Sequence, residues 1–386
     1  MIKEKIDMKR WIITGLIGLL LLIIGYLFYI NRDYGTVTQT FEGELIDLNP
    51  PTIEELYRFS PESLKEIKKL DITFPDLCPP GTKGYDTFPS IVSKLINLEE
   101  LYCMGNEISD LSPIMHLIHL QKIYLRDNNV SDWKGFENLT NLIYLDISYN
   151  ELSDLEGIEK LENLQSLNLF GNRNLSNLKG IETLRNLKEL SIGHNNLESF
   201  PPELLHLKNL KSLSLEGLYF ESFPDSFYTV SLPIESLYIR NMYNFDYDSN
   251  LPKFHQLKNL RELYIGGNNI AKLNIDFEKC EKLESFIYGS HEKIDVTDIL
   301  TRISKSPKLK YLGLSDNSIQ YLPKDIVLPD SLEELNLSYN NIKKLPIKIA
   351  EYTNLKKVDL RNNPIDTMAI KKIEKEMVNT KFYYDK

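Results

Sequence analysis

Residues 142–152, LIYLDISYNEL, set the pattern that most of the chain repeats. Leu142, Leu145, Ile147, Asn150 and Leu152 stand at the spacing LxxLxLxxNxL. The spacing recurs every 22 to 26 residues in twelve units, which begin at Leu98, Leu120, Leu142, Leu164, Leu187, Leu210, Ile234, Leu260, Leu283, Leu309, Leu332 and Leu355. A period of this length is typical of a chain built from stacked repeats.

Each unit predicts a short strand followed by a turn. In the quoted stretch, Leu145 and Ile147 alternate with Tyr144, Asp146 and Ser148, so a strand here has one apolar face and one polar face. One such strand cannot bury a core alone, but stacked copies can, in a parallel sheet with strands about 4.8 Å apart. We therefore expect an α/β solenoid whose strands form one parallel β-sheet.

An asparagine follows the strand in nine of the twelve units. A buried turn would leave backbone N–H and C=O groups without partners, and an asparagine side chain offers both a donor and an acceptor. We expect a structural ladder of these residues: Asn106, Asn128, Asn150, Asn172, Asn195, Asn268, Asn317, Asn340 and Asn363. Leu218, Met242 and His291 take the place of the asparagine in the other three units.

The units resemble two classes of leucine-rich repeat. Those that begin at Leu98, Leu120 and Leu142 have tails such as NELSDLEGIEKLENL, which resemble the 22-residue repeats of internalins. Later units contain LESFPPELLHLKNL and IKKLPIKIAEYTNL, which resemble the 23-residue type with LP after the asparagine turn. The resemblance covers most of residues 67–365 and implies a horseshoe that binds proteins or other ligands on its concave face. We do not carry over the role of internalins in invasion, because no cell-wall sorting motif is visible after the repeats.

A stretch of twenty residues without a charge, 11–30, follows a basic opening segment. That length matches a membrane span. A cleaved signal peptide is the alternative, but its apolar core is usually about 7 to 15 residues long and it needs small residues at a cleavage site, which YLFYINRDYG does not offer. Lys3, Lys5, Lys9 and Arg10 precede the span and only Arg32 follows closely. The positive-inside rule then places residues 1–10 in the cytoplasm and the repeats outside it, in a periplasm or at a cell surface.

The segments around the repeats complete the predicted organisation. Residues 31–60 show little periodicity and are interpreted as a linker. Ser60, followed by Pro61, predicts the start of a helix. Residues 61–97 contain this helix and a degenerate repeat and are interpreted as an N-terminal cap. The repeats occupy residues 98–365, and residues 366–386 are expected to form a C-terminal cap of a helix and a short strand. Atypical terminal units cover the open ends of a solenoid.

Composition and charge narrow the possible partners. The chain is 42% hydrophobic and 26% charged, which is ordinary for a folded protein. Residues 33–386 contain 40 basic and 53 acidic groups, a formal charge of −13, which argues against a nucleic-acid partner. Three cysteines are too few for a disulfide framework. Cys103 stands at an inward repeat position, either as a small core residue or as the partner of Cys78 in a bridge.

No group of residues predicts catalysis, a cofactor site or a metal site. His116 and His119 are three residues apart but flank core leucines, and the other histidines lack ligand spacing. The GGNN at Gly266 follows a strand, but it belongs to a repeat turn rather than to a phosphate loop. We therefore expect a protein that is not an enzyme.

The outward residues of the strands are the candidate binding site, because the core does not need them. Tyrosine and arginine are enriched at the anchors of protein interfaces. Together with one phenylalanine they form the candidate set Tyr102, Tyr124, Arg126, Phe170, Tyr238, Arg240 and Tyr264. Tyrosine also suits strands and stacks on its neighbours across a sheet, so a purely structural role is the alternative.

Two functions agree with this reading. The leading hypothesis is a membrane-anchored module that binds a protein partner, or another surface ligand, through its concave face. The alternative is a scaffold subunit of an envelope complex that acts through its convex side or its membrane helix. Substitutions on the concave face distinguish the two, since they should weaken partner binding only in the first case.

Overall fold

The structure is a computed structural model that describes residues 52–74, 83–267, 270, 272–290 and 294–385. The chain divides into two units, Met1–Ile46 and Asp47–Lys386, and the described residues belong to the second. The expected tail at 1–10, the expected anchor at 11–30 and three single residues, Cys78, Asn268 and His291, lie outside the described residues. Within residues 52–385 as described, no helix has the length and apolar character needed to cross a bilayer.

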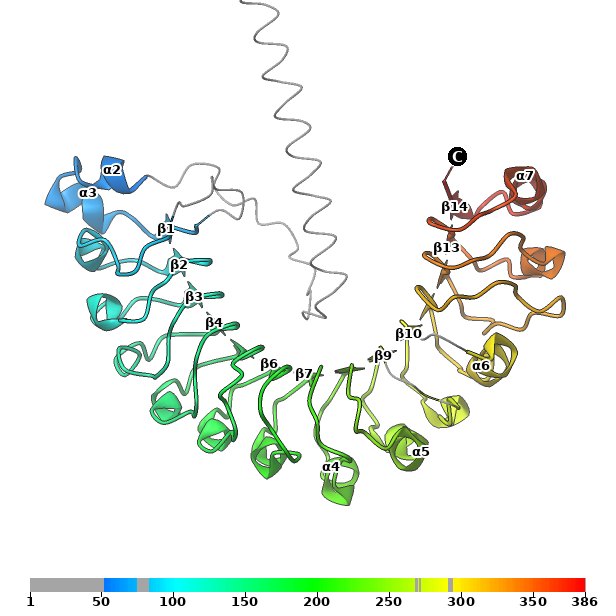
Figure 1. Cartoon of the computed structure of the whole chain (residues 1–386), viewed down its shortest axis with the longest axis horizontal. Helices are drawn as coiled ribbons and strands as arrows, with labels where there is room; N and C mark the ends of the chain where they lie inside the picture. Colours follow the sequence, from blue (N-terminus) through cyan, green and yellow to red (C-terminus); the bar gives the residue numbers. More distant parts are fainter. Residues whose placement is uncertain (1–51, 75–82, 268–269, 271, 291–293, 386) are drawn as a thin grey trace, which may run out of the picture. The chain divides into compact units, whose positions relative to one another are not determined.

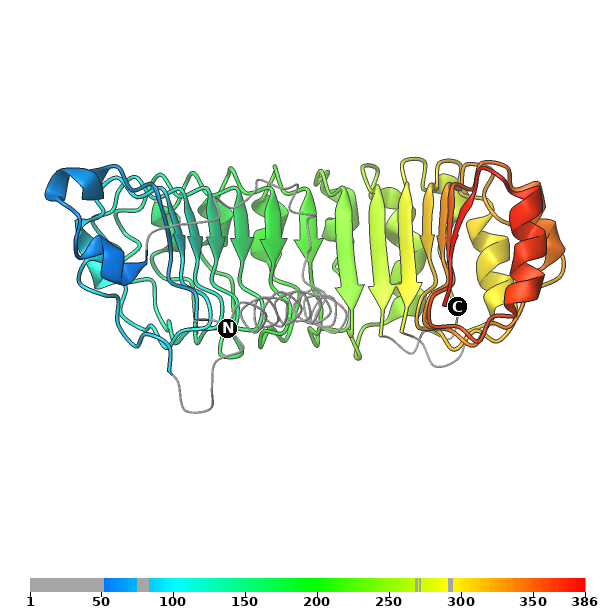
Figure 2. The same ribbon diagram turned by 90° about the horizontal axis from the view of Figure 1, so that it is seen from above.

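Fourteen short strands form one parallel sheet in the described part of the chain, which confirms the predicted β-sheet solenoid. Each strand pairs with the strands that precede and follow it in the sequence. In this unit the strands lie on the inner side of an arc (Figure 1) and run side by side along it (Figure 2). They are β1 (Lys69–Asp71), β2 (Glu100–Tyr102), β3 (Lys122–Tyr124), β4 (Tyr144–Asp146), β5 (Ser166–Asn168), β6 (Glu189–Ser191), β7 (Ser212–Ser214), β8 (Ser236–Arg240), β9 (Glu262–Gly266), β10 (Ser285–Gly289), β11 (Tyr311–Gly313), β12 (Glu334–Asn336), β13 (Lys357–Asp359) and β14 (Lys381–Tyr383).

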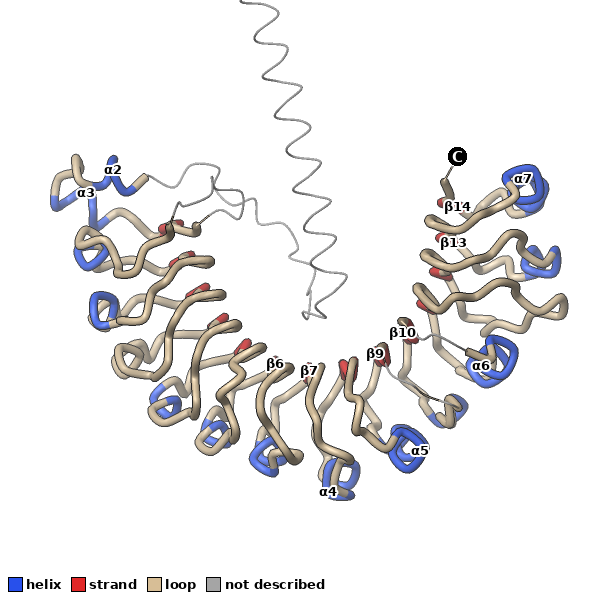
Figure 3. Tube along the Cα trace, viewed as in Figure 1, coloured by secondary structure: helices blue, strands red, loops and turns tan. Residues whose placement is uncertain are grey.

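The return segments on the outer side of the arc are loops, short helices and 3₁₀ turns (Figure 3). The α-helices are α2 (Ile53–Leu56), α3 (Pro61–Lys65), α4 (Asp225–Thr229), α5 (Tyr247–Asn250), α6 (Val296–Ile303) and α7 (Thr367–Glu376). The 3₁₀ turns are η1 (Val92–Lys94), η2 (Ser112–Ile114), η3 (Ile158–Lys160), η4 (Ile181–Thr183), η5 (Pro202–His206), η6 (Leu251–Gln256), η7 (Phe277–Lys279) and η8 (Ile347–Glu351).

Neighbouring repeats stack in register, so that equivalent residues lie on top of one another. Leu145 in β4 pairs with Ile123 in β3 and with Leu167 in β5. These three side chains point away from the inner face and are at most 1% exposed. Equivalent positions along the arc bury a continuous apolar core, as expected for units that cannot bury a core alone.

The asparagine side chains connect each turn to the repeat before it. Asn150 Nδ2 donates to the carbonyl of Leu125 in the preceding repeat at 2.9 Å and to that of Ile147 in its own repeat at 3.2 Å. Asn150 Oδ1 accepts from the N–H of Val130, also in the preceding repeat, at 2.9 Å. The same donation to a carbonyl of the preceding repeat is made by Asn106, Asn128, Asn172, Asn195, Asn317, Asn340 and Asn363.

A second column of asparagines, which was not predicted, lies before the strands. Each of these residues directly precedes the first leucine of a unit, and its Nδ2 donates to a backbone carbonyl of the preceding repeat. The bonds are solvent-exposed and are made by Asn97, Asn141, Asn163, Asn186, Asn209 and Asn354. Where both columns are present, consecutive repeats are therefore joined by side-chain hydrogen bonds at both ends of the strands.

The N-terminal end of the solenoid includes residues that were expected to be linker. Helix α2 lies within residues 31–60, and its Leu56 is fully buried in the core. The helix starts at a capping box, in which Thr52 and Glu55 each accept from the other's backbone N–H. The linker prediction is therefore wrong for residues 53–56. At the other end, α7 and β14 follow the last repeat, and β14 pairs with β13.

Cys103 is a buried thiol in this structure. Its Sγ lies 3.4 Å from the carbonyl oxygen of Tyr124, to which it donates. Its suggested partner, Cys78, lies outside the described residues, so the bridge stays a prediction.

Replacing Asn150 by alanine should lower the free energy of unfolding by about 1 to 3 kcal/mol, because buried backbone groups in two repeats lose their partner. Asn163→Ala is the matched control, since Asn163 makes one exposed bond, to the carbonyl of Thr140 at 2.9 Å. Its effect should be about 1 kcal/mol or less. Urea titrations of both variants test this, and an Asn150→Ala effect no larger than that of Asn163→Ala would contradict it.

Candidate functional site

The outward residues of the strands form the inner face of the arc, which we call the concave face. In β2, for example, Leu101 is fully buried while Glu100 and Tyr102 on either side of it are half-buried. The alternation follows from the pleat, which sends successive side chains to opposite sides of a sheet. The first and third residues of each strand therefore define this surface.

Three tyrosines lie against one another across β2, β3 and β4, and we call them the N-terminal tyrosine group. The rings of Tyr102 and Tyr124 are nearly parallel, with centroids 4.4 Å apart and planes 8° apart. Tyr144 continues the row, 4.7 Å from Tyr124 at an angle of 35°. Sequence reasoning missed Tyr144 because it is the first residue of its strand, whereas the predicted tyrosines are third residues.

The carboxylate next to this group is neutralised within the protein. Tyr102 donates from its hydroxyl to Glu100 Oε2 at 2.9 Å. The Nζ atoms of Lys69 and Lys122 each lie 3.3 Å from a Glu100 carboxylate oxygen. Burial alone would raise the pKa of Glu100, but the hydrogen bond from Tyr102 and the two lysines outweigh it and lower the pKa.

A second pair of tyrosines lies on β8 and β9, and we call it the C-terminal tyrosine group. The rings of Tyr238 and Tyr264 meet edge to face, with centroids 6.4 Å apart. Tyr238 donates from its hydroxyl to Glu262 Oε2 at 3.1 Å, and Ser236 donates to the same oxygen at 2.9 Å. Burial raises the pKa of both tyrosines, so their rings are held in the neutral form.

Polar side chains, small except for Glu189, separate the two tyrosine groups. The outward residues of β5, β6 and β7 are Ser166, Asn168, Glu189, Ser191, Ser212 and Ser214. Four strand spacings separate β4 from β8, which is about 19 Å. The concave face thus presents aromatic rings on both sides of a stretch with polar side chains.

The residues just after the strands pack on one another along the arc. The Arg126 guanidinium carbon lies 5.0 Å from the centre of the Tyr149 ring. The ring of Phe170 lies between those of Tyr149, at 5.3 Å, and His194, at 4.9 Å. We call this row the rim stack. It consists of a cation followed by three rings, contributed by four consecutive repeats.

Glu216 joins the next repeats to the rim stack. His194 Nε2 lies 3.9 Å from Glu216 Oε1, and an Arg240 guanidinium nitrogen lies at the same distance from that oxygen. Gly217 leaves the space for the imidazole. It has φ +66°, and a Cβ there would lie 2.6 Å from the ring of His194.

Comparisons with known proteins agree with the observed sheet. The family described as leucine rich repeat matches residues 118–173 and 306–366, a two-copy form of it matches 96–138, and a single-repeat form matches 186–207. The chain is a leucine-rich repeat protein. Proteins of this family are scaffolds for protein–protein binding rather than enzymes.

Several solved structures resemble this leucine-rich repeat protein. An internalin, InlF, from Listeria monocytogenes is 25% identical, with 85% of this chain and 89% of that chain covered and a TM-score of 0.58. A leucine-rich repeat protein from Leptospira interrogans is 24% identical, with 83% and 97% covered and a TM-score of 0.49. The mouse RP105/MD-1 complex contains a chain that is 19% identical, with 81% and 58% covered and a TM-score of 0.55. In the comparison with curated proteins, no sequence matches the chain.

In the structure of this leucine-rich repeat protein, the predicted binding residues lie in three different settings. Tyr102 and Tyr124 lie together, and so do Tyr238 and Tyr264, each pair on the concave face. Arg126 lies over a ring of the rim stack. Tyr124 is only 8% exposed because the rings of Tyr102 and Tyr144 lie against it, and it belongs to the surface as part of that group. The other two predicted residues contact groups of the protein itself: Phe170, 1% exposed, lies between two rings of the rim stack, and Arg240, 9% exposed, lies 3.9 Å from Glu216. We therefore leave Phe170 and Arg240 out of the candidate surface.

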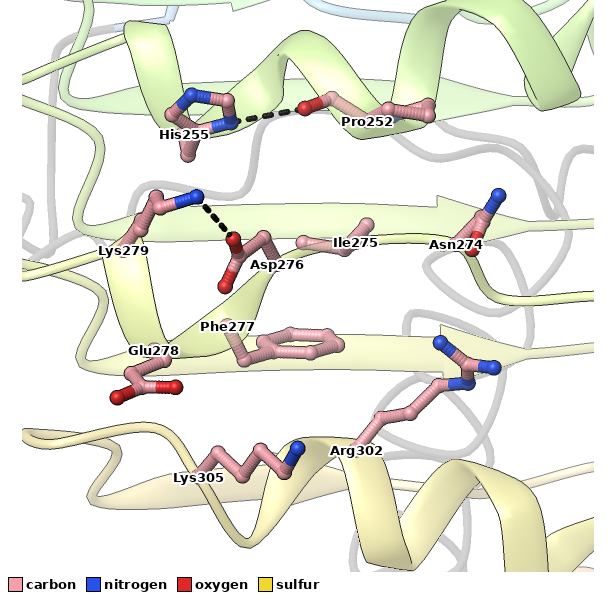
Figure 4. A pocket seen from close by; sticks show the side chains of 10 residues that line it. All are labelled: Pro252, His255, Asn274, Ile275, Asp276, Phe277, Glu278, Lys279, Arg302 and Lys305. Atoms are coloured by element: carbon pink, nitrogen blue, oxygen red, sulfur yellow. Dashed lines mark hydrogen bonds and ion pairs between the residues drawn. The ribbon is translucent and has the colours of Figure 1, made fainter.

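A cavity of about 510 Å³ lies away from the strands, between η6, η7 and the end of α6 (Figure 4). Three of the charged groups that line it, Asp276, Lys279 and Arg302, are paired within the protein. Lys279 Nζ lies 2.8 Å from Asp276 Oδ2, and Arg302 Nε lies 2.8 Å from Asp298 Oδ2. Among the residues described, no group of three or more His, Cys, Asp or Glu side chains could hold a metal ion. The concave face is thus the better candidate for the functional site.

The leucine-rich repeat protein should lose stability as the pH rises above about 10, where exposed tyrosines ionise. Burial raises the pKa of Tyr102, Tyr144 and Tyr238 above that value, so the folded chain binds more protons than the unfolded chain in this range. Their stabilising contribution is complete below pH 10 and is lost as the pH rises towards the folded-state pKa. Urea titrations between about pH 8 and pH 11 test this. A triple variant with Tyr102→Phe, Tyr144→Phe and Tyr238→Phe should lose less free energy of unfolding over this range. A pH dependence equal to that of the wild type would contradict the raised pKa of these tyrosines.

Proposed function

We propose that this leucine-rich repeat protein binds another protein through its concave face, displayed outside the cytoplasm by a membrane anchor at residues 11–30. The observation that supports binding is the pair of tyrosine groups on the outward side of the sheet. The core does not require aromatic rings at these positions, because its apolar residues point the other way. A tyrosine ring supplies apolar contact area, and its hydroxyl adds a directional hydrogen bond.

The spacing of the two groups favours a macromolecular partner. Tyr102 on β2 and Tyr238 on β8 are six strand spacings apart, which is about 29 Å along the sheet. A small metabolite cannot contact both groups at once. A folded protein can, since standard interfaces bury about 800 Å² on each partner and involve about 20 to 30 residues. The mouse structure with this fold is itself a complex of RP105 with MD-1, which agrees with a protein as the partner class.

The proposed membrane topology is supported by the sequence, with four basic residues before the uncharged span and one close behind it. Protease added to intact cells, or to spheroplasts where an outer membrane intervenes, should digest residues 33–386. Complete protection of these residues, with digestion after the membrane is permeabilised, would contradict the proposed orientation.

A photo-crosslinking residue can identify the partner and the face it occupies. Ser166 is half-buried in β5 on the concave face, and Lys160 is exposed in η3 on the outer side of the neighbouring repeat. With the full chain in its membrane, a crosslinker at position 166 should capture one protein reproducibly. The same crosslinker at position 160 should not capture that protein. Equal capture at both positions would favour the scaffold alternative.

Substitution of either tyrosine group should then weaken binding of the captured partner at least tenfold, in the range of interface anchors. The variants are Tyr102→Ala with Tyr124→Ala, and Tyr238→Ala with Tyr264→Ala. Tyr321→Ala is the control, because that side chain is 71% exposed and lies outside the strands. If both double variants bind like the wild type and keep its thermal unfolding midpoint, the concave face is not the binding site.

A further inference from the structure

The carboxylates of the concave face differ in how their charge is compensated. Glu100 has Lys69 and Lys122 at 3.3 Å, and Glu334 has Lys357 at 3.3 Å. Glu262 instead accepts two hydroxyl hydrogen bonds, from Tyr238 and Ser236, and makes no ion pair with any residue that the structure describes. Neutral groups therefore orient its carboxylate, and no lysine or arginine of the described residues pairs with it.

Both hydroxyls bond to the same oxygen of Glu262. Oε2 accepts from Tyr238 at 3.1 Å and from Ser236 at 2.9 Å, which fixes the carboxylate against β8. Oε1 takes part in neither bond. The residue is exposed at the start of β9, and the half-buried ring of Tyr238, whose hydroxyl it binds, meets the ring of Tyr264 edge to face. An exposed carboxylate held beside an electron-rich ring attracts a cation by its charge and by cation–π contact.

We propose that Glu262, Tyr238 and Tyr264 form a recognition site for an arginine side chain of the partner protein. Arginine fits better than lysine, because its planar guanidinium stacks on a tyrosine ring while it donates N–H groups to a carboxylate. This inference rests on the proposed function and adds the chemistry of the partner. Arg240 is not part of this site, since it is 9% exposed and lies 3.9 Å from Glu216.

The net charge of the chain agrees with a basic group on the partner. Residues 33–386 carry a formal charge of −13, so a partner with a basic surface is attracted during approach. Such long-range attraction is not specific to one residue. A test must therefore separate the Glu262 site from general attraction to an acidic protein.

The test uses the full chain in a lipid nanodisc, with ¹³C-labelled tyrosine, and NMR titration with a defined probe. The probe is the blocked peptide Gly-Gly-Arg-Gly-Gly, and its control contains citrulline, which has nearly the same shape as arginine but no charge. Tyr238 and Tyr264 signals should shift saturably with the arginine peptide, and the citrulline peptide should bind at least tenfold more weakly. Equal binding of the two peptides would overturn the proposal.

Two carboxylate variants locate the site. Glu262→Gln should weaken binding of the arginine peptide at least tenfold, whereas Glu100→Gln should leave it within twofold of the wild type. Equal losses in both variants would indicate general attraction and overturn the proposal, as would unchanged binding in Glu262→Gln. Unshifted Tyr102 and Tyr124 signals show that Glu262→Gln is folded. If it is not, Tyr264→Leu, which keeps the carboxylate, should weaken binding severalfold, and unchanged binding would overturn the proposal.

The peptide titration and the crosslinking experiment can fail independently. Capture of a partner from position 166, together with no preference for arginine over citrulline, would refute the arginine site and leave the proposed function standing. An arginine preference that depends on Glu262, without capture from position 166, would refute the proposed function in its present form.

Discussion

The hydrogen bonds of the asparagine turns hold each repeat to the one before it, and the rest of the fold depends on this connection. Asn150 bonds to carbonyls in two repeats and accepts an N–H from the earlier one. Because this arrangement recurs, the strands meet in constant register and the inward residues form one core. The outward residues are then placed side by side across strands, which brings distant tyrosines such as Tyr102 and Tyr124 within stacking distance.

Where the asparagine is missing, apolar packing replaces its hydrogen bonds. Leu218 and Met242 occupy the turn position in two successive units and are fully buried. Beside them an aromatic cluster fills the interior, with ring centroids 4.5 to 6.3 Å apart among Phe200, Phe220, Phe223, Phe227, Phe245 and Phe254. Asn250 provides some of the missing polar partners from another position, since it accepts from the Phe223 N–H and the Tyr228 hydroxyl. The C-terminal tyrosine group lies next to this exceptional part of the solenoid.

The sequence predicted the repeat unit well because period and polarity are local properties. Leu145 and Ile147 face the core as their alternation indicates, and both are fully buried. The second asparagine column could also have been predicted, since residues such as Asn141 and Asn163 directly precede the first leucine of a unit. Helix α2 was missed because a single turn with one buried residue, Leu56, has no detectable period.

The candidate site was harder to predict, because it depends on contacts between repeats. Phe170 and Arg240 occupy outward positions in the pattern, yet the first is enclosed by rings of the repeats on either side and the second faces Glu216. Tyr144 joins the N-terminal group from the other outward position of its strand. Glu100 forms ion pairs with Lys69 and Lys122, whereas Glu262 accepts a hydrogen bond from Tyr238. These neighbours lie 22 to 31 residues away in the chain. None of these pairings can be read from one unit alone.

The central claim is that a protein partner covers the concave face, and hydroxyl-radical footprinting of the full chain with and without its captured partner tests it most directly. Tyrosine side chains are oxidised where they contact solvent, so each ring reports on its own surroundings. The account predicts that the partner reduces oxidation of Tyr102, Tyr144, Tyr238 and Tyr264 and leaves Tyr321, 71% exposed outside the strands, unchanged. Protection of Tyr321 with unchanged oxidation of the four concave tyrosines would contradict it.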